Sequence, residues 1–182
     1  MLSFDEIITA TLTADRSPEV IRFFSYLTTF GDFAVVVGLT ILSCFFFIRT
    51  RHRAYVGALF VTSMGSALSV AWLKIFFARA RPQDPIALMT LDSYSFPSGH
   101  AAAAIALYGF LIYLAIGVGH TSALRRIAAL ILVVLIALIG VSRLYLGVHY
   151  ASDVIAGYFV GLLWLAFGMW LTRHLGSMNR PH

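Results

Sequence analysis

The sequence is poor in charged residues and in cysteine, and each shortage excludes a structural feature or a class of protein. Only 12% of its 182 residues are charged while 60% are hydrophobic, which excludes an ordinary soluble domain. The single cysteine, Cys44, excludes an internal disulfide. No low-complexity segment, persuasive repeat or linker interrupts the chain, so residues 1–182 are predicted to form one domain.

Long apolar runs dominate what is there. They are long enough, or nearly so, to cross a bilayer, and lie at residues 32–48, 54–77, 98–119, 127–146 and 150–172. Residues 1–31 mix charges with scattered apolar residues, which is typical of helices lying on a membrane surface. The sequence therefore predicts an all-α, polytopic transmembrane helix bundle of about five spans in residues 32–175, preceded by N-terminal interfacial helices in residues 1–31.

The formal net charge of +5 raises the question of nucleic acid binding, but the placement of the charges favours a membrane topology instead. With five crossings, all eight acidic residues fall on one side. Seven arginines share the other side: Arg49, Arg51, Arg53, Arg125, Arg126, Arg173 and Arg180. The positive-inside rule then predicts a membrane protein whose C-terminus is cytoplasmic and whose acidic side faces outward. Nucleic acid is not a predicted partner; the lipid bilayer is.

Three short polar islands interrupt the apolar sequence, and the first contains the only lysine. Lys74 ends the second predicted span and is followed, after six residues, by Arg81-Pro82. Because the residue before proline is disfavoured in helical geometry, the helix is predicted to end by Arg81, and both cations could converge on one anion. The alternative is that they only anchor the helix end among lipid headgroups.

The second island, Pro97-Ser98-Gly99-His100, opens the third predicted span, with Pro97 in its first turn. The free N–H groups of a helix start can hold phosphate oxygens, Gly99 permits close approach, and Ser98 adds a hydroxyl donor. His100 would then lie beside the reacting group. One alternative is a simple capping turn. The other is a serine hydrolase, but this sequence lacks the glycine that such an enzyme has two residues before its nucleophilic serine.

The third island runs from Ser142 to Asp153. Arg143 offers a planar fork suited to phosphate. His149 and Asp153 are four residues apart on one helix face, so the carboxylate could hold one ring nitrogen while the other attacks phosphorus. The alternative is a helix-start acid beside an unrelated histidine.

A metal site is the weaker interpretation of the same residues. His100, His149 and Asp153, together with Asp84 or Asp92, include ligand types but no dense ligand set. Several cations converging on the same place would repel a metal ion and favour an anion. We therefore predict no metal and no cofactor.

Taken in their order along the chain, the three polar islands resemble the three-part signature of the type 2 phosphatidic acid phosphatase superfamily. The motifs are Lys-x6-Arg-Pro, Pro-Ser-Gly-His and Ser-Arg-x5-His-x3-Asp, and every position is filled between residues 74 and 153. Many bacterial members have six spans, of which this chain is expected to lack the first.

The resemblance implies a metal-independent phosphatase of a bacterial inner membrane that hydrolyses a phosphomonoester or diphosphate of a membrane lipid through a phosphohistidine. Its active site would face the periplasm or exterior. His149 would attack phosphorus, Asp153 would hold and polarise it, and His100 would protonate the leaving oxygen and then activate water. Five further residues would bind the phosphate: Lys74, Arg81, Ser98, Gly99 and Arg143.

Substrates matching the family include undecaprenyl diphosphate, phosphatidylglycerol phosphate, phosphatidic acid and a phosphorylated glycolipid, with a weak preference for the first. A lipid phosphotransferase would use the same residues. A transporter or channel is disfavoured because the motif residues lie near one membrane face, and a vanadium haloperoxidase because the chain is small and membrane-embedded. The sequence does not indicate an oligomeric state.

Two expectations concern packing around the site. Each methylene exposed to water costs about 0.8 kcal/mol, so the site is expected to open laterally near the headgroups, flanked by the loop from Gln83 to Phe96. Gly157 and Gly161 form a small-xxx-small pair that could pack the last span within the bundle or against a second subunit.

Overall fold

The structure, a computed structural model, describes the backbone of residues 3–82, 93–117 and 122–178, and the side chains of these ranges up to residue 174. Every regular element within those ranges is helical, and no strand occurs in them. The prediction of an all-α protein is confirmed.

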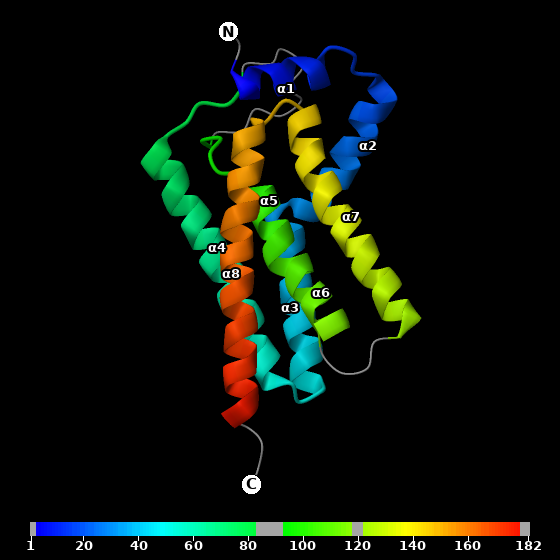
Figure 1. Cartoon of the computed structure of the whole chain (residues 1–182), viewed down its shortest axis with the longest axis vertical. Coiled ribbons are helices and arrows are strands. Elements are labelled where there is room, and N and C mark those ends of the chain that lie inside the picture. Colours follow the sequence, from blue (N-terminus) through cyan, green and yellow to red (C-terminus); the bar gives the residue numbers. More distant parts are fainter. Residues whose placement is uncertain (1–2, 83–92, 118–121, 179–182) are drawn as a thin grey trace.

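Helices that run up and down the long axis make the bundle (Figure 1). They are α3 (Phe33–Arg49), α4 (Arg53–Phe77), α5 (Gly99–Ala104) continued by the π-helical turn η2 (Ile105–Gly109) and α6 (Phe110–Gly117), α7 (Ala123–Tyr145) and α8 (Ala151–Met178). Four segments of the described chain are long and apolar enough to cross a membrane: Arg53–Phe77, Gly99–Gly117, Ala123–Tyr145 and Ala151–His174. A fifth span is formed if Pro18–Gly31 and Phe33–Arg49, bent by 45°, cross as one. The prediction of a polytopic bundle with about five spans is confirmed.

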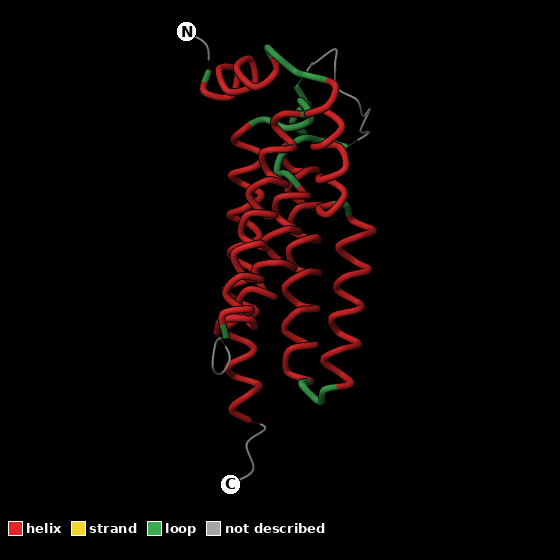
Figure 2. The backbone as a smooth tube through the Cα atoms, turned by 90° about the vertical axis from the view of Figure 1, so that its right-hand side faces the viewer, coloured by secondary structure: helices red, strands yellow, loops and turns green. Residues whose placement is uncertain are grey.

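The N-terminal helices cover one end of this bundle. Helix α1 (Phe4–Thr13) lies across the end (Figure 2), and its start is fixed by a reciprocal capping box between Ser3 and Glu6. Helix α2 (Pro18–Thr28) runs down beside α7 and leads through the short turn η1 (Thr29–Gly31) into α3. The surface-lying arrangement expected for residues 1–31 thus describes α1 better than α2, and the assignment of this whole region to the membrane interface stays a prediction.

Helix α5 lies at the centre of the bundle and packs tightly against α8. The small side chains Ala101, Ala102 and Ala104 are buried. A Cβ atom added at Gly157 would lie 2.4 Å from the Ser98 carbonyl oxygen, and one added at Gly161 would lie 2.7 Å from that of Ala102. The small-xxx-small pair therefore packs α8 within the bundle, which decides between the two alternatives that the sequence left open.

The three polar islands meet at the end of the bundle that α1 covers. Helix α4 ends there, α5 begins there, and the turn that joins α7 to α8 lies at the same end (Figure 1). Gly147 makes that turn with a φ of 70°, a left-handed conformation that favours glycine. Segments far apart in sequence are thus brought to one place.

Candidate active site

His149 and Asp153 form the centre of the site. Helix α8 begins at Ala151, so Asp153 lies in its first turn, while His149 lies two residues before the helix and not on it as predicted. His149 Nδ1 is 3.4 Å from Asp153 Oδ2, and the Tyr150 backbone N–H donates to the same oxygen at 2.9 Å. The side chains of His149 and Asp153 are only 2% and 0% exposed. The pair is held in a dry pocket with the other ring nitrogen, Nε2, directed away from the carboxylate.

The protonation of His149 follows from this burial. Loss of hydration lowers the pKa of His149 to about 3, and the nearby guanidinium groups of Arg143 and Arg81 act in the same direction, while Asp153 opposes them. At neutral pH the ring is therefore uncharged and Nε2 keeps its lone pair. Arg81 Nη1 lies 3.3 Å from Nε2, so an anion bound by this arginine would lie next to the nitrogen.

Lys74 and Arg81 approach the same place from the end of α4. The helix ends at Phe77, and Ala78 adopts a left-handed conformation that turns the chain, so Lys74 is on the last turn and Arg81 on the loop, as predicted. The Lys74 ammonium donates to the Tyr94 carbonyl oxygen. Arg81 donates to the carbonyl oxygens of Val148 at 2.6 Å and Ser93 at 2.8 Å, and burial lowers its pKa. Both cations donate hydrogen bonds to backbone carbonyl oxygens, and the oxygens of an incoming phosphate could accept these hydrogen bonds instead.

Arg143 is a buried cation with unused donors. Its side chain is 1% exposed, and Nη1 donates to the Thr28 hydroxyl at 2.8 Å. Within the described part of the chain, Nε and Nη2 have no hydrogen-bond partner. A buried guanidinium with unpaired N–H groups is costly unless an anion completes it. The charge of Arg143 also acts on His100, on His149 and on Lys74, so Arg143 contributes to the electrostatics of the site.

His100 and Ser98 enter the site from the start of α5. His100 Nε2 donates to Asp32 Oδ1 at 2.7 Å, which fixes the orientation of the ring. Helix α5 begins at Gly99, with Ser98 as its N-cap, so Pro97 precedes the helix and does not occupy its first turn. The Ser98 backbone N–H donates to the Asp153 carbonyl oxygen at 2.9 Å, and its hydroxyl accepts from the Ala101 N–H. Of the Ser98 donors, only the hydroxyl proton is left for a phosphate.

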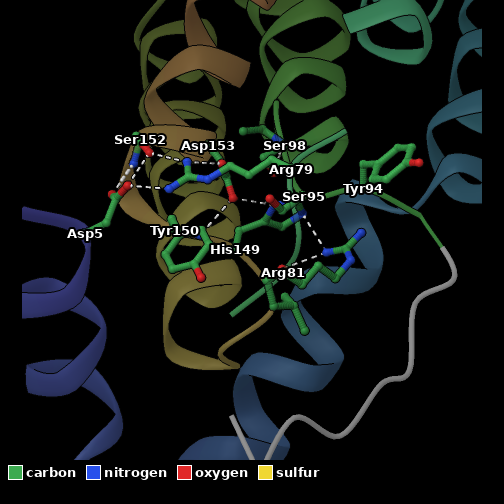
Figure 3. Close-up of polar contacts among 12 residues, drawn as sticks. Asp5, Arg79, Arg81, Tyr94, Ser95, Ser98, His149, Tyr150, Ser152 and Asp153 are labelled. Atoms are coloured by element: carbon green, nitrogen blue, oxygen red, sulfur yellow. Dashed lines mark hydrogen bonds and ion pairs between the residues drawn. The ribbon is translucent and has the colours of Figure 1, made fainter. Parts of the chain in front are cut away.

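Several polar partners in the site were not predicted from the sequence. They are Thr28, which binds Arg143; Asp32, which binds His100; and Arg79 with Asp5, which connect to Asp153 (Figure 3). Arg79 lies between Lys74 and Arg81 in the sequence, and this position within the first polar island was the one available signal. The other three carry no motif.

Part of the predicted surroundings lies outside the described residues. This applies to residues 83–92 of the loop expected to flank the lipid opening, including Asp84 and Asp92 of the alternative metal set. Among the residues that the structure describes, no group of three or more His, Cys, Asp or Glu side chains is arranged to hold a metal ion.

Gly157 provides a test of how tightly the site is packed. Gly157→Ala would press a methyl group against the Ser98 carbonyl oxygen, so we expect a loss of about 1–3 kcal/mol in the free energy of unfolding and a clear fall in activity. Thermal denaturation in detergent would measure the first effect. Gly38→Ala is the matched control, because a Cβ there meets nothing within 4 Å. Equal melting temperatures for the two variants would contradict the packing described here.

Comparison with known proteins gives a consistent result. Residues 54–176 match the model of the PAP2 superfamily. Phosphatidylglycerophosphatase B of Bacillus subtilis (strain 168) is 31% identical over 165 residues, which are 88% of this chain and 79% of that protein. The crystal structure of a transmembrane PAP2 type phosphatidylglycerolphosphate phosphatase from Bacillus subtilis superposes with a TM-score of 0.78 at 28% identity, covering 97% of this chain and 86% of that one. Aquifex aeolicus LpxE superposes with a TM-score of 0.75 at 27% identity, covering 92% and 96%.

Proposed function

We propose a mechanism and a substrate for this chain on the premise that it belongs to the PAP2 superfamily. This membership confirms the family resemblance of its sequence. The protein is a multi-pass membrane protein of the lipid phosphatase class. We propose that it hydrolyses a lipid phosphate through a phosphohistidine at His149. The observation that carries this proposal is the buried Arg143: its Nε and Nη2 have no hydrogen-bond partner among the described residues, and its charge acts on His149, as expected of a group that binds an oxyanion in this site.

In the first step, the neutral His149 Nε2 attacks phosphorus, and the bond from phosphorus to the leaving oxygen of the lipid breaks. Asp153 stabilises the positive charge that develops on the ring through the Nδ1 proton. His100 gives its proton to the leaving oxygen. Because Nε2 of His100 is held by Asp32, Nδ1 is the nitrogen assigned to this transfer.

The cations bind the phosphoryl oxygens during both steps. Lys74, Arg81 and Arg143, with the Ser98 hydroxyl and the close approach allowed at Gly99, stabilise the charge of the five-coordinate transition state. In the second step, His100 is deprotonated, takes a proton from water, and the resulting hydroxide displaces His149 from phosphorus. Inorganic phosphate is released and His149 returns to its neutral state.

An apolar cavity next to the site supports a lipid as the substrate. Its volume is about 580 Å³, and it extends from Lys74 and His100 at the covered end to Ile41 and Phe60 farther along α3 and α4. Its walls are mainly Val, Ala, Phe, Ile and Met side chains of α3, α4 and α5. A lipid chain lying here would stay in contact with apolar surface while its phosphate reaches His149.

For the lipid itself, the comparisons change the order that the sequence favoured. The curated relative and the first solved structure, both from Bacillus subtilis, are named as phosphatases of phosphatidylglycerol phosphate. We therefore place phosphatidylglycerol phosphate ahead of undecaprenyl diphosphate, phosphatidic acid and a phosphorylated glycolipid. We further propose that the covered end of the bundle faces the periplasm or exterior, because the described arginines of the α3–α4 turn and of the start of α7 lie at the opposite end.

Phosphate release from a panel of purified lipids would test the substrate. The protein in detergent micelles is expected to release phosphate fastest from phosphatidylglycerol phosphate, in the presence of a chelator, and to be inhibited by vanadate, which mimics five-coordinate phosphorus. If labelled phosphate instead appears on an acceptor lipid, the protein is a phosphotransferase. If no lipid in the panel loses phosphate, the proposal is wrong.

A further inference from the structure

The carboxylate of Asp153 has a second partner besides His149. Its Oδ1 accepts a hydrogen bond from Arg79 Nη1 at 2.7 Å, and the same nitrogen donates to the Ser152 hydroxyl at 2.7 Å (Figure 3). The guanidinium carbon of Arg79 also lies 4.2 Å from the centre of the Tyr150 ring. Arg79 is therefore fixed in plane and direction, and it holds the side of Asp153 that faces away from His149.

Helix α1 supplies the opposite end of this connection. Asp5 Oδ2 accepts from Arg79 Nη2 at 2.8 Å and from the Ser152 hydroxyl at 2.5 Å, while Oδ1 accepts from the Ser152 backbone N–H at 2.9 Å. Asp5 thus satisfies a free N–H group in the first turn of α8 from 147 residues away. It lies outside residues 54–176, the part of the chain that matches the family model.

The other two ionisable groups of this connection, Asp5 and Arg79, are both charged. Although burial acts to raise it, hydrogen bonds from Arg79 and Ser152 hold the pKa of the Asp5 carboxyl below its usual value. Although burial acts to lower it, the two carboxylates raise the pKa of Arg79. Asp5, Arg79 and Asp153 therefore form an ion-pair chain with a net charge of minus one.

We propose that Asp5 and Arg79 are positioning residues for the reaction, so that the N-terminal helix α1 completes the active site through this ion-pair chain. Arg79 alone would fix Asp153 but would also neutralise it. Asp5 adds one negative charge to the Arg79–Asp153 pair, and this charge balances the positive ring that forms when His149 accepts the phosphoryl group. The inference rests on the proposed phosphohistidine mechanism and adds to it residues that do not touch the substrate.

Kinetics of Asp5→Asn, Arg79→Gln and the double variant would test the ion-pair chain. Asparagine has the size of aspartate and can still accept from Ser152, so α1 should stay in place. We expect Asp5→Asn to lower kcat about tenfold and to leave KM unchanged, because only the balance of charge around Asp153 changes. In the Arg79→Gln background, Asp5→Asn should have no further effect, since Asp5 acts through Arg79. Asp15→Asn, an exposed aspartate after α1, is the matched control and should behave as wild type.

The pH profile gives a readout that loosened packing would not produce. His149 must be neutral to attack, so activity falls as pH drops through its pKa. Loss of a negative charge in Asp5→Asn should move this acidic limb to lower pH, and loss of a positive charge in Arg79→Gln should move it to higher pH. The other charged or titratable groups around His149 and Asp153 are the same in all variants: Lys74 of α4, Arg81 of the loop, His100 of α5 and Arg143 of α7.

Activities are to be expressed per folded enzyme, with the folded fraction taken from thermal denaturation. Wild-type kcat per folded Asp5→Asn enzyme would overturn the inference, as would a tenfold loss that persists unchanged in the Arg79→Gln background. Limbs that move in the same direction in both single variants would also overturn it. If the wild-type protein releases no phosphate from any lipid, the proposed function itself has failed; if wild type is active while Asp5→Asn is normal, only the present inference has failed.

Discussion

His149→Ala is expected to reduce phosphate release by at least about 10⁴-fold, because the group that forms the covalent intermediate is lost and no neighbouring side chain can replace it. Among the described residues, His100 is the only other imidazole in the site, and its Nε2 is bound to Asp32. The cations Lys74, Arg81 and Arg143 all remain, so binding of the lipid phosphate should change little. The measurements are phosphate release and the rise in melting temperature on adding vanadate, which reports anion binding.

The matched control is His52→Ala. His52 is exposed near the opposite end of the bundle, where its ring stacks on Tyr55, and it has no connection to the site. This variant should keep wild-type activity. Quenching with alkali and detergent during turnover, conditions in which a phosphohistidine is stable, should trap phosphate on wild-type protein and on the control, with none on His149→Ala. Ordinary turnover by His149→Ala would refute the mechanism.

Arg143→Lys should lower kcat by about 10²-fold or more, the usual cost of losing one fixed donor to the charge of a transition state. The substitution keeps the positive charge. It removes the planar pair Nε and Nη2, which have no partner in the described chain and are proposed to bind two phosphoryl oxygens together. An ammonium presents its donors from a single atom and cannot reproduce that geometry.

Arg126→Lys is the control on the same helix, at an exposed position near the start of α7, and should leave kcat unchanged. Melting temperatures separate a catalytic effect from loss of the contact between Arg143 and Thr28. Near-normal turnover by Arg143→Lys would mean that Arg143 only supports the fold.

The proposed site and the helical frame could be predicted because their signals are local. The spans follow from uninterrupted apolar runs, and the observed helices begin and end within a few residues of the predicted ones. The proximity of His149 and Asp153 follows from a spacing of four residues across the start of one helix. The first two islands lie at the end of one span and the start of the next, and two further crossings return the chain to the third island, so the sequence pattern also predicts that all three islands lie at the same membrane face.

The partners that orient these groups were decided only by the tertiary structure. Asp32 and His100 are 68 residues apart, Arg79 and Asp153 are 74, Thr28 and Arg143 are 115, and Asp5 and Ser152 are 147. The sequence determined which helices form, which side of the membrane each end shares, and which side chains can carry the chemistry. Which buried charge meets which partner depended on how helices rotate and pack against one another, because an ion pair needs side chains within a few ångströms in space and leaves no periodic trace along the chain.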